Sequence, residues 1–174
     1  QGVPTGVVTE VFMMVPSPGD DAEFGDSVSR HGRDLFSASG TTTVLTMPEN
    51  LRQVELEREL QGRQQLTVRQ RYYLITPGVA EIEEAGELRA REGTGDRFSF
   101  GGLKVFVNGC GHDGLGRPLE DAKWTQDELT RVVTEADRRG MQVWLHSLTA
   151  EGVRSAARAI LGATQGINSL RHRI

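Results

Sequence analysis

Apolar residues follow two different spacings along this chain, and segments of the two kinds alternate. The helical spacing is clearest over residues 129–136, where Leu, Val and Ala recur at i, i+3, i+4 and i+7. Thr125-Gln126-Asp127-Glu128 comes just before and has the form of a capping box, in which a hydroxyl and a carboxylate each satisfy a free backbone N–H. The pattern predicts a helix that begins after Thr125 and ends at Gly140.

The next segments predict a strand and then another helix. Residues 141–146 are apolar at alternate positions and have the length of a strand. Thr149 is a suitable N-cap for a helix that we expect Gly162 to end. The apolar face expected for this helix comprises Val153, Ala156, Ala157, Ile160 and Leu161. Residues 169–174 then look like the start of a further strand.

The same alternation runs through the earlier part of the chain, after a turn-rich entry segment at residues 1–23 that we expect to be irregular. The predicted helices cover residues 24–38, 49–62 and 79–88, and the predicted strands cover residues 41–46, 68–75 and 103–107. This alternation indicates an α/β fold with a parallel sheet covered by helices. A doubly wound open sheet and part of a (β/α)8 TIM barrel both fit. A complete barrel usually needs about 250 residues, so the preferred barrel would be partial, with about five βα units.

Composition narrows the class of protein. The chain has 174 residues, which suits a single domain, and its net charge is −4. No basic surface is therefore expected for nucleic acid or an anionic membrane, and no apolar run approaches the ~18 residues that a membrane span needs. The single cysteine, Cys110, excludes an internal disulfide and fits a reducing compartment, so a cytoplasmic location is expected.

Lys104 is the first candidate for chemistry. Alternation places Lys104, Phe106 and Asn108 on one face of the predicted strand and branched apolar residues on the other. The ammonium group would then be buried on the face of the sheet opposite the branched residues. Burial of this charge costs free energy unless the group is paired or neutralised. The alternative is a lysine at a strand end whose ammonium reaches solvent or pairs with a carboxylate.

His146 is the second candidate. It ends the strand at residues 141–146, on the same face as Gln142 and Trp144, and a helix follows. Ligands and catalytic groups collect at this end of the strands in both α/β architectures. The alternative is a histidine satisfied by a neighbouring hydrogen bond. We expect His31 to lie at the surface and His172 to be structural.

A glycine-rich segment, GCGHDGLG at residues 109–116, lies between these two strands. Its G-x-G-x-x-G spacing is that of dinucleotide-binding loops. However, no helix opens within the motif, and the next strand ends in His146 rather than in an acidic residue. We therefore favour an active-site loop over residues 109–124, in which His112 and Asp113 contact substrate or metal. No H-x-H, H-E-x-x-H, C-x-x-C, G-x-S-x-G or Walker A pattern occurs.

Several segments, in order, resemble the metal-dependent amidohydrolase superfamily, especially its amidohydrolase-3 group. GLKVFVNG at residues 102–109 resembles the "vKlfaDG" strand, and residues 127–146 resemble "eeL…A…Gmqv.vHaiGd". RHRI at residues 171–174 resembles "RHRIEH" without its last two residues. Near the start, PTGVVTE resembles "PtGvl.E" and SGTTTV resembles "sGiTtv". The resemblance spans nearly the whole chain.

The resemblance implies a (β/α)8 barrel with one or two divalent metal ions, zinc or another, at its C-terminal mouth. By motif match, Lys104 takes the place of the carboxylated lysine and His146 that of the fifth-strand histidine. The other ligands would lie outside residues 1–174, including the H-x-H pair, the sixth-strand histidine and the aspartate that acts as general base. Asn108 stands where the family has aspartate, and we expect it to contact substrate together with His112 and Asp113.

The chemistry of these side chains agrees with that assignment. A neutral lysine amine reacts with CO₂ to give a carbamate, an anionic oxygen ligand that bridges two cations, and neutral imidazole suits zinc and similar metals. A metal-bound water loses its proton near neutral pH and attacks a carbonyl that the metal polarises.

These observations predict a metal-dependent hydrolase of amide or cyclic-amide C–N bonds in a small molecule, of which residues 1–174 are an interior piece. Such a piece holds at most two metal ligands, so we expect it to be inactive alone, to bind metal weakly and to self-associate through its open strand edges, with a homo-oligomer as one form. Two alternatives remain. One is a non-catalytic α/β module that binds a nucleotide or phosphate through residues 109–116, and the other is a degenerate barrel kept for assembly.

Overall fold

The structure, a computed structural model, describes residues 30–32, 34–48, 51–75, 81–92, 97–108 and 124–174. Within these residues four parallel strands form one sheet in the order β1-β2-β3-β4. The strands are β1 (Thr43–Thr46), β2 (Arg69–Ile75), β3 (Phe98–Phe106) and β4 (Gln142–His146). The helices are α2 (Leu51–Gly62), α3 (Glu81–Glu92), α4 (Gln126–Arg138) and α5 (Ala150–Thr164), and residues 34–38 are also helical.

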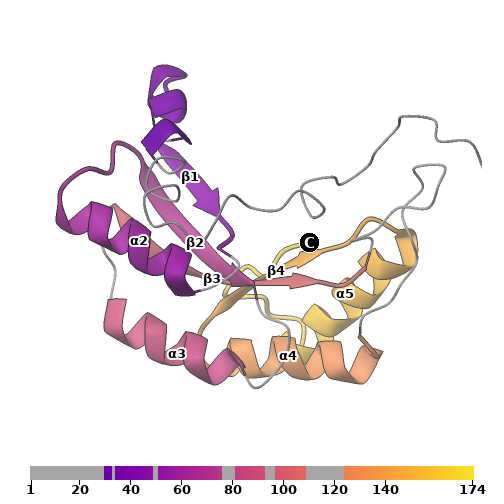
Figure 1. The fold of residues 1–174 in the computed structure, drawn as a ribbon. Helices are drawn as coiled ribbons and strands as arrows, with labels where there is room; N and C mark the ends of the chain where they lie inside the picture. The colour runs from indigo at the N-terminus through magenta and orange to yellow at the C-terminus, as the bar shows by residue number, and fades with distance from the viewer. Residues whose placement is uncertain (1–29, 33, 49–50, 76–80, 93–96, 109–123) are drawn as a thin grey trace, which may run out of the picture.

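The order of the strands decides between the two predicted architectures. Consecutive strands are neighbours, a helix follows each of them, and the sheet curls with α2, α3, α4 and α5 along its outer side (Figure 1). A doubly wound sheet reverses its strand order and carries helices on both faces. The described part of the chain is therefore a partial β/α barrel. The predicted strand at residues 169–174 is present only as a bridge between Arg173 and Trp144, so a fifth βα unit is not established.

Strand β3 begins earlier than predicted, at Phe98 instead of Leu103, because a bulge interrupts its alternation. Phe100 pairs with Tyr72, but the next pair is Gly102 with Tyr73, so Gly101 is an extra residue. A Cβ on Gly101 would lie 2.6 Å from the Tyr73 ring. A Cβ on Gly102, whose φ is +147°, would lie 2.0 Å from the carbonyl oxygen of Gln142 in β4. Only glycine fits both positions.

The core lies between the sheet and the helices. Its larger cluster joins the outer face of β3 and β4 to α3, α4 and α5, with Leu103, Val105, Val143 and Leu145 fully buried. A smaller cluster packs Val54 and Leu60 of α2 against Tyr72 and Phe98. These four strand residues point away from Lys104 and His146, so their burial against the helices fixes the opposite orientation of the inner-face side chains.

Helix α4 begins as predicted. Thr125 and Glu128 form a complete capping box, and Leu129, Val132, Val133 and Ala136 are buried. Helix α5 also begins at the predicted N-cap, Thr149.

The predicted end and part of the predicted face of α5 are wrong. The helix continues through Gly162 to Thr164 and ends where Gln165 adopts a left-handed φ of 50°. Gly162 causes no break because it lies on the exposed side of the helix, where the i→i−4 bonds continue. Val153 is 43% exposed and Leu161 is 61% exposed. The residues that face the core are Gly152, Ala156, Ala159, Ile160 and Thr164.

The earlier elements match the predicted positions within a few residues. Strands β1 and β2 fall inside the predicted ranges, and α2 and α3 overlap the predicted helices. The entry segment at residues 1–23 lies outside the described residues. Every helix in the described part of the chain is too short or too polar to cross a lipid bilayer.

Candidate functional site

The inner face of the sheet brings the two predicted metal ligands to the same side. In the register of β3 and β4, Lys104 pairs with Trp144 and Phe106 pairs with His146. Paired residues of parallel neighbours point to the same side of a sheet, so Lys104 and His146 share the inner face, one strand and two residues apart. His146 is the last residue of β4, where barrel enzymes place reactive groups.

Lys104 is enclosed by aromatic rings. The residue is only 3% exposed, and its Nζ lies 4.4 Å from the ring centroid of Trp144 and 5.2 Å from that of Phe106. The alternative in which its ammonium reaches solvent is therefore not what the structure has. The rings attract a cation through their π faces and exclude water from the amine.

His146 is half-buried and lies against the same aromatic group. Its ring centroid is 5.1 Å from that of Phe106, and the two planes are tilted by 58°. Phe106 therefore contacts both predicted ligands, since Lys104 lies over its ring as well. One aromatic side chain holds the amine and the imidazole on a common surface.

Asn108 lies beyond the end of β3 and binds the segment that follows His146. Its Nδ2 donates to Thr149 Oγ1, and its Oδ1 accepts from the N–H of Leu148 at 3.3 Å. Thr149 Oγ1 also accepts the N–H of Gly152 at 3.1 Å and so caps α5. Both described contacts of the Asn108 amide are thus with the chain itself, and its predicted contact with substrate stays a prediction.

Three further residues of the inner face were not predicted. Tyr73 donates from its hydroxyl to Gln142 Oε1 at 2.6 Å, and Gln142 Nε2 donates to the carbonyl oxygens of Leu170 and Arg171 at 2.9 and 2.7 Å. Arg173 follows, with its guanidinium carbon 4.9 Å from the Tyr73 centroid and 4.6 Å from the Trp144 centroid. The alternation that groups Gln142, Trp144 and His146 was a signal for Gln142, but the short tail gave none for Arg173.

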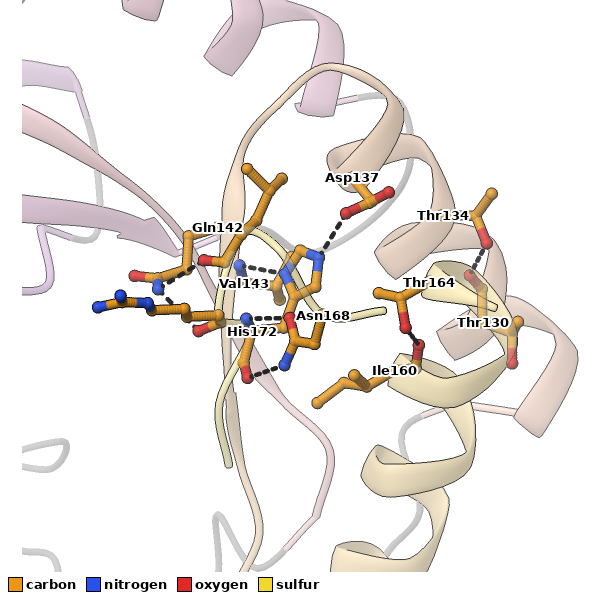
Figure 2. A network of polar contacts seen from close by, with 11 residues as sticks. Thr130, Thr134, Asp137, Gln142, Val143, Ile160, Thr164, Asn168 and His172 are labelled. Atoms are coloured by element: carbon orange, nitrogen blue, oxygen red, sulfur yellow. Dashed lines mark hydrogen bonds and ion pairs between the residues drawn. The ribbon is translucent and has the colours of Figure 1, made fainter. Parts of the chain in front are cut away.

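A buried histidine fixes the chain that carries Arg173. Figure 2 shows His172 between β4 and α4: its Nδ1 accepts the N–H of Val143 at 2.9 Å, and its Nε2 lies 3.0 Å from Asp137 Oδ1. The side chain of Asn168 bonds both the N–H and the carbonyl of His172, at 2.7 and 2.8 Å. His172 therefore has the structural role that we predicted, and His31 is exposed, also as predicted.

The donors present fit part of a metal site. An amine able to become a carbamate and an imidazole are both suitable ligands, and they share one face. No three His, Cys, Asp or Glu side chains come together as a metal site among the residues that the structure describes. His112 and Asp113, the other predicted site residues, lie outside those residues, as does most of the loop at residues 109–124.

Two solved structures have a similar fold. One is the crystal structure of an uncharacterized metal-dependent hydrolase from Pyrococcus horikoshii OT3, with a TM-score of 0.62 and 16% identity, covering 80% of this chain and 30% of that chain. The other is the crystal structure of an uncharacterized metal-dependent hydrolase from Pyrococcus furiosus, with a TM-score of 0.59 and 20% identity, covering 78% of this chain and 30% of that chain. At these identities the likeness concerns the fold.

This chain therefore spans about 30% of the length of each of those two structures. No protein-family model and no curated protein sequence matches it.

Proposed function

We propose that this chain carries part of the active site of a metal-dependent hydrolase that cleaves an amide or cyclic-amide C–N bond in a small molecule. The observation that carries the proposal is the placement of Lys104 and His146 on one face of neighbouring parallel strands, near their C-terminal ends. Two proteins of similar fold are named metal-dependent hydrolases, which supports the reaction class.

In this proposal Lys104, as a carbamate, and His146, as a neutral imidazole, would hold a divalent metal ion such as zinc, with one or two ions per site. When bound, such an ion supplies a hydroxide near neutral pH and polarises the carbonyl under attack. Trp144 and Phe106 enclose the Lys104 amine on the inner face, where a carbamate formed with CO₂ would meet the metal ion.

The residues around the two ligands set their positions. Phe106 contacts both side chains, and Asn108 anchors the segment that leaves His146 to the N-terminus of α5. Ligands held by packing and outer hydrogen bonds keep their orientation, which metal sites require. We propose that the remaining ligands and the general base come from segments other than the described ones, as the amidohydrolase-3 resemblance implies.

The test is the metal content of the full-length protein and its turnover of small N-acyl and cyclic-amide substrates. Lys104→Met keeps an apolar side chain among the rings but removes the amine. We expect this variant to contain less bound metal and to have a kcat reduced by at least roughly 100-fold. The reason is that a metal site without one of its ligands binds the ion more weakly and activates water less well.

Arg158→Met is the matched control, since Arg158 is an exposed basic residue on α5. It should keep the metal content and kcat of the wild type. If Lys104→Met folds like the wild type and retains its metal and its turnover, the assignment of Lys104 and with it the proposal fails.

A further inference from the structure

Arg173, a half-buried residue, extends its guanidinium across the inner face of the sheet. The bridge between Arg173 and Trp144 fixes its backbone, with Arg173 N donating to Val143 O at 3.0 Å and Leu145 N donating to Arg173 O at 2.8 Å. From there the side chain crosses Trp144 and reaches Tyr73, whose ring is nearly perpendicular to that of Trp144. Two aromatic faces therefore hold the guanidinium in place.

One edge of this guanidinium lacks a partner within the described part of the chain. Nε and Nη2 of Arg173 are both buried, and neither makes a hydrogen bond to a described residue. The N–H of Nε and one N–H of Nη2 point in the same direction along one edge of the guanidinium. They therefore match the two oxygens of one carboxylate. Buried donors without acceptors are costly, so such an edge is expected to be filled when the protein works.

The charge of the guanidinium favours an anion. The guanidinium lies over the ring of Trp144, 4.6 Å from the ring centroid, and that contact supplies no acceptor for its N–H groups. Among the described residues, no acidic side chain forms an ion pair with Arg173. A bound anion would satisfy the open edge and offset the positive charge.

We propose that Arg173, framed by Tyr73 and Trp144, anchors a binding site for the carboxylate of a small molecule. The site rests on contacts that need no metal. If the proposed function holds, the site also implies that the substrate carries a carboxylate besides the bond to be cleaved. Only this statement about the substrate rests on the proposed function.

The binding test uses the chain without added metal and follows the fluorescence of Trp144, which lies against the guanidinium. Sodium acetate is titrated against sodium chloride at equal ionic strength, and ¹⁵N-labelled arginine side chains are followed by NMR as a second signal. We expect a saturable response to acetate that is absent with chloride. Arg173→Lys keeps the charge but loses the paired donors, so it should weaken the response at least roughly ten-fold.

The controls separate this site from its neighbours. Arg171→Lys changes an exposed arginine two residues away and should respond like the wild type. Trp124→Phe leaves Trp144 as the remaining tryptophan, so its fluorescence response to acetate should persist. Lys104→Met should still bind acetate, which shows that the site does not depend on the proposed metal ligand.

Two results would overturn the proposal. The first is the lack of a saturable acetate response in the folded wild type, or an equal response in Arg173→Lys. The second is a response to acetate that Lys104→Met abolishes, because the open edge would then belong to a site that Lys104 forms. Loss of metal binding in the full-length protein would leave this result unaffected, so the two proposals fail separately.

Discussion

Gly152 shows how much a single missing side chain does near the site. A Cβ at this position of α5 would overlap the side-chain amide of Asn108. We predict that Gly152→Ala lowers the free energy of unfolding by about 1–3 kcal/mol, as overpacking does, in urea denaturation. Gly62→Ala is the control, because no atom lies within 4 Å of its added Cβ, and it should change stability by less than about 1 kcal/mol. Equal losses in both variants would disprove the clash.

His172 is the second residue whose effect can be measured directly. Its removal leaves the buried N–H of Val143 without an acceptor and Asp137 without its partner. We predict that His172→Ala costs about 2–4 kcal/mol of stability, from the unsatisfied donor and the cavity together. The exposed His31 gives the comparison, and His31→Ala should stay within about 0.5 kcal/mol of the wild type in the same urea titration. A small effect of His172→Ala would mean that the bonds drawn in Figure 2 do not anchor the tail.

At the scale of the element, the start of α4 rests on its capping box. Thr125 Oγ1 accepts the N–H of Glu128, and Glu128 Oε2 accepts the N–H of Thr125 at 2.9 Å. We predict that Thr125→Ala lowers stability by about 1 kcal/mol, measured by thermal or urea unfolding. Thr134→Ala, within the same helix and exposed, should cost less, since alanine has the higher helix propensity. The reverse order would argue against the cap.

The end of α4 makes a pH-dependent contribution. Hydrogen bonds from Arg138 and then Arg139 lower the pKa of Glu135 from 4.5 to about 2. A folded-state pKa below the unfolded value means that this stabilisation is present above pH 4.5 and is lost as the pH falls toward about 2. We therefore expect Glu135→Gln to lose less stability than the wild type over this range, in urea midpoints measured at each pH.

Glu87→Gln serves as the control for that experiment. Glu87 is exposed on α3, outside the cluster of Glu135 with its two arginines, so its variant should follow the acid decline of the wild type. If Glu135→Gln and the wild type decline in parallel, the ion pairs at the end of α4 contribute nothing in solution.

At the scale of the whole molecule, exposed apolar side chains lie at the edge strand β1 and on the helix α5. Leu45 and Met47 near β1 are each 41% exposed, and Leu161 of α5 is 61% exposed. Unpaired strand edges next to apolar patches favour association. We predict that the chain associates in a concentration-dependent way in sedimentation velocity, and that Leu161→Lys weakens this association without changing unfolding. Arg154→Lys, on the exposed side of the same helix, should leave it unchanged.

The sequence predicted the elements well where local chemistry specifies them. The capping box at Thr125 and the alternation before His146 located α4 and β4 because both signals act within a few residues. The end of α5 was wrong because a glycine on an exposed helix face does not break the helix. Arg173 was missed because its importance comes from Tyr73, a residue far away in the chain.

Two of the predicted site residues lie on neighbouring strands, and their role as metal ligands stays a prediction. Lys104 and His146 were expected on a common face, and the register of β3 and β4 agrees. Metal binding also needs further ligands, which these two strands do not supply. The aromatic enclosure of Lys104 was not predicted, because it depends on which residues of β4 lie opposite β3. Pairing between strands is a tertiary property that a single strand's pattern does not contain.

The extra glycine in β3 has an evolutionary consequence. Side chains upstream of Gly101 and those downstream follow opposite parity, so Phe100 and Leu103 both reach the helices while Lys104 points into the barrel. Because Gly101 is the extra residue, deletion of its codon would restore plain alternation from Phe98 to Phe106 and leave Lys104 on the inner face. At this one place the strand can lose a residue and still present the same side chains to the same face.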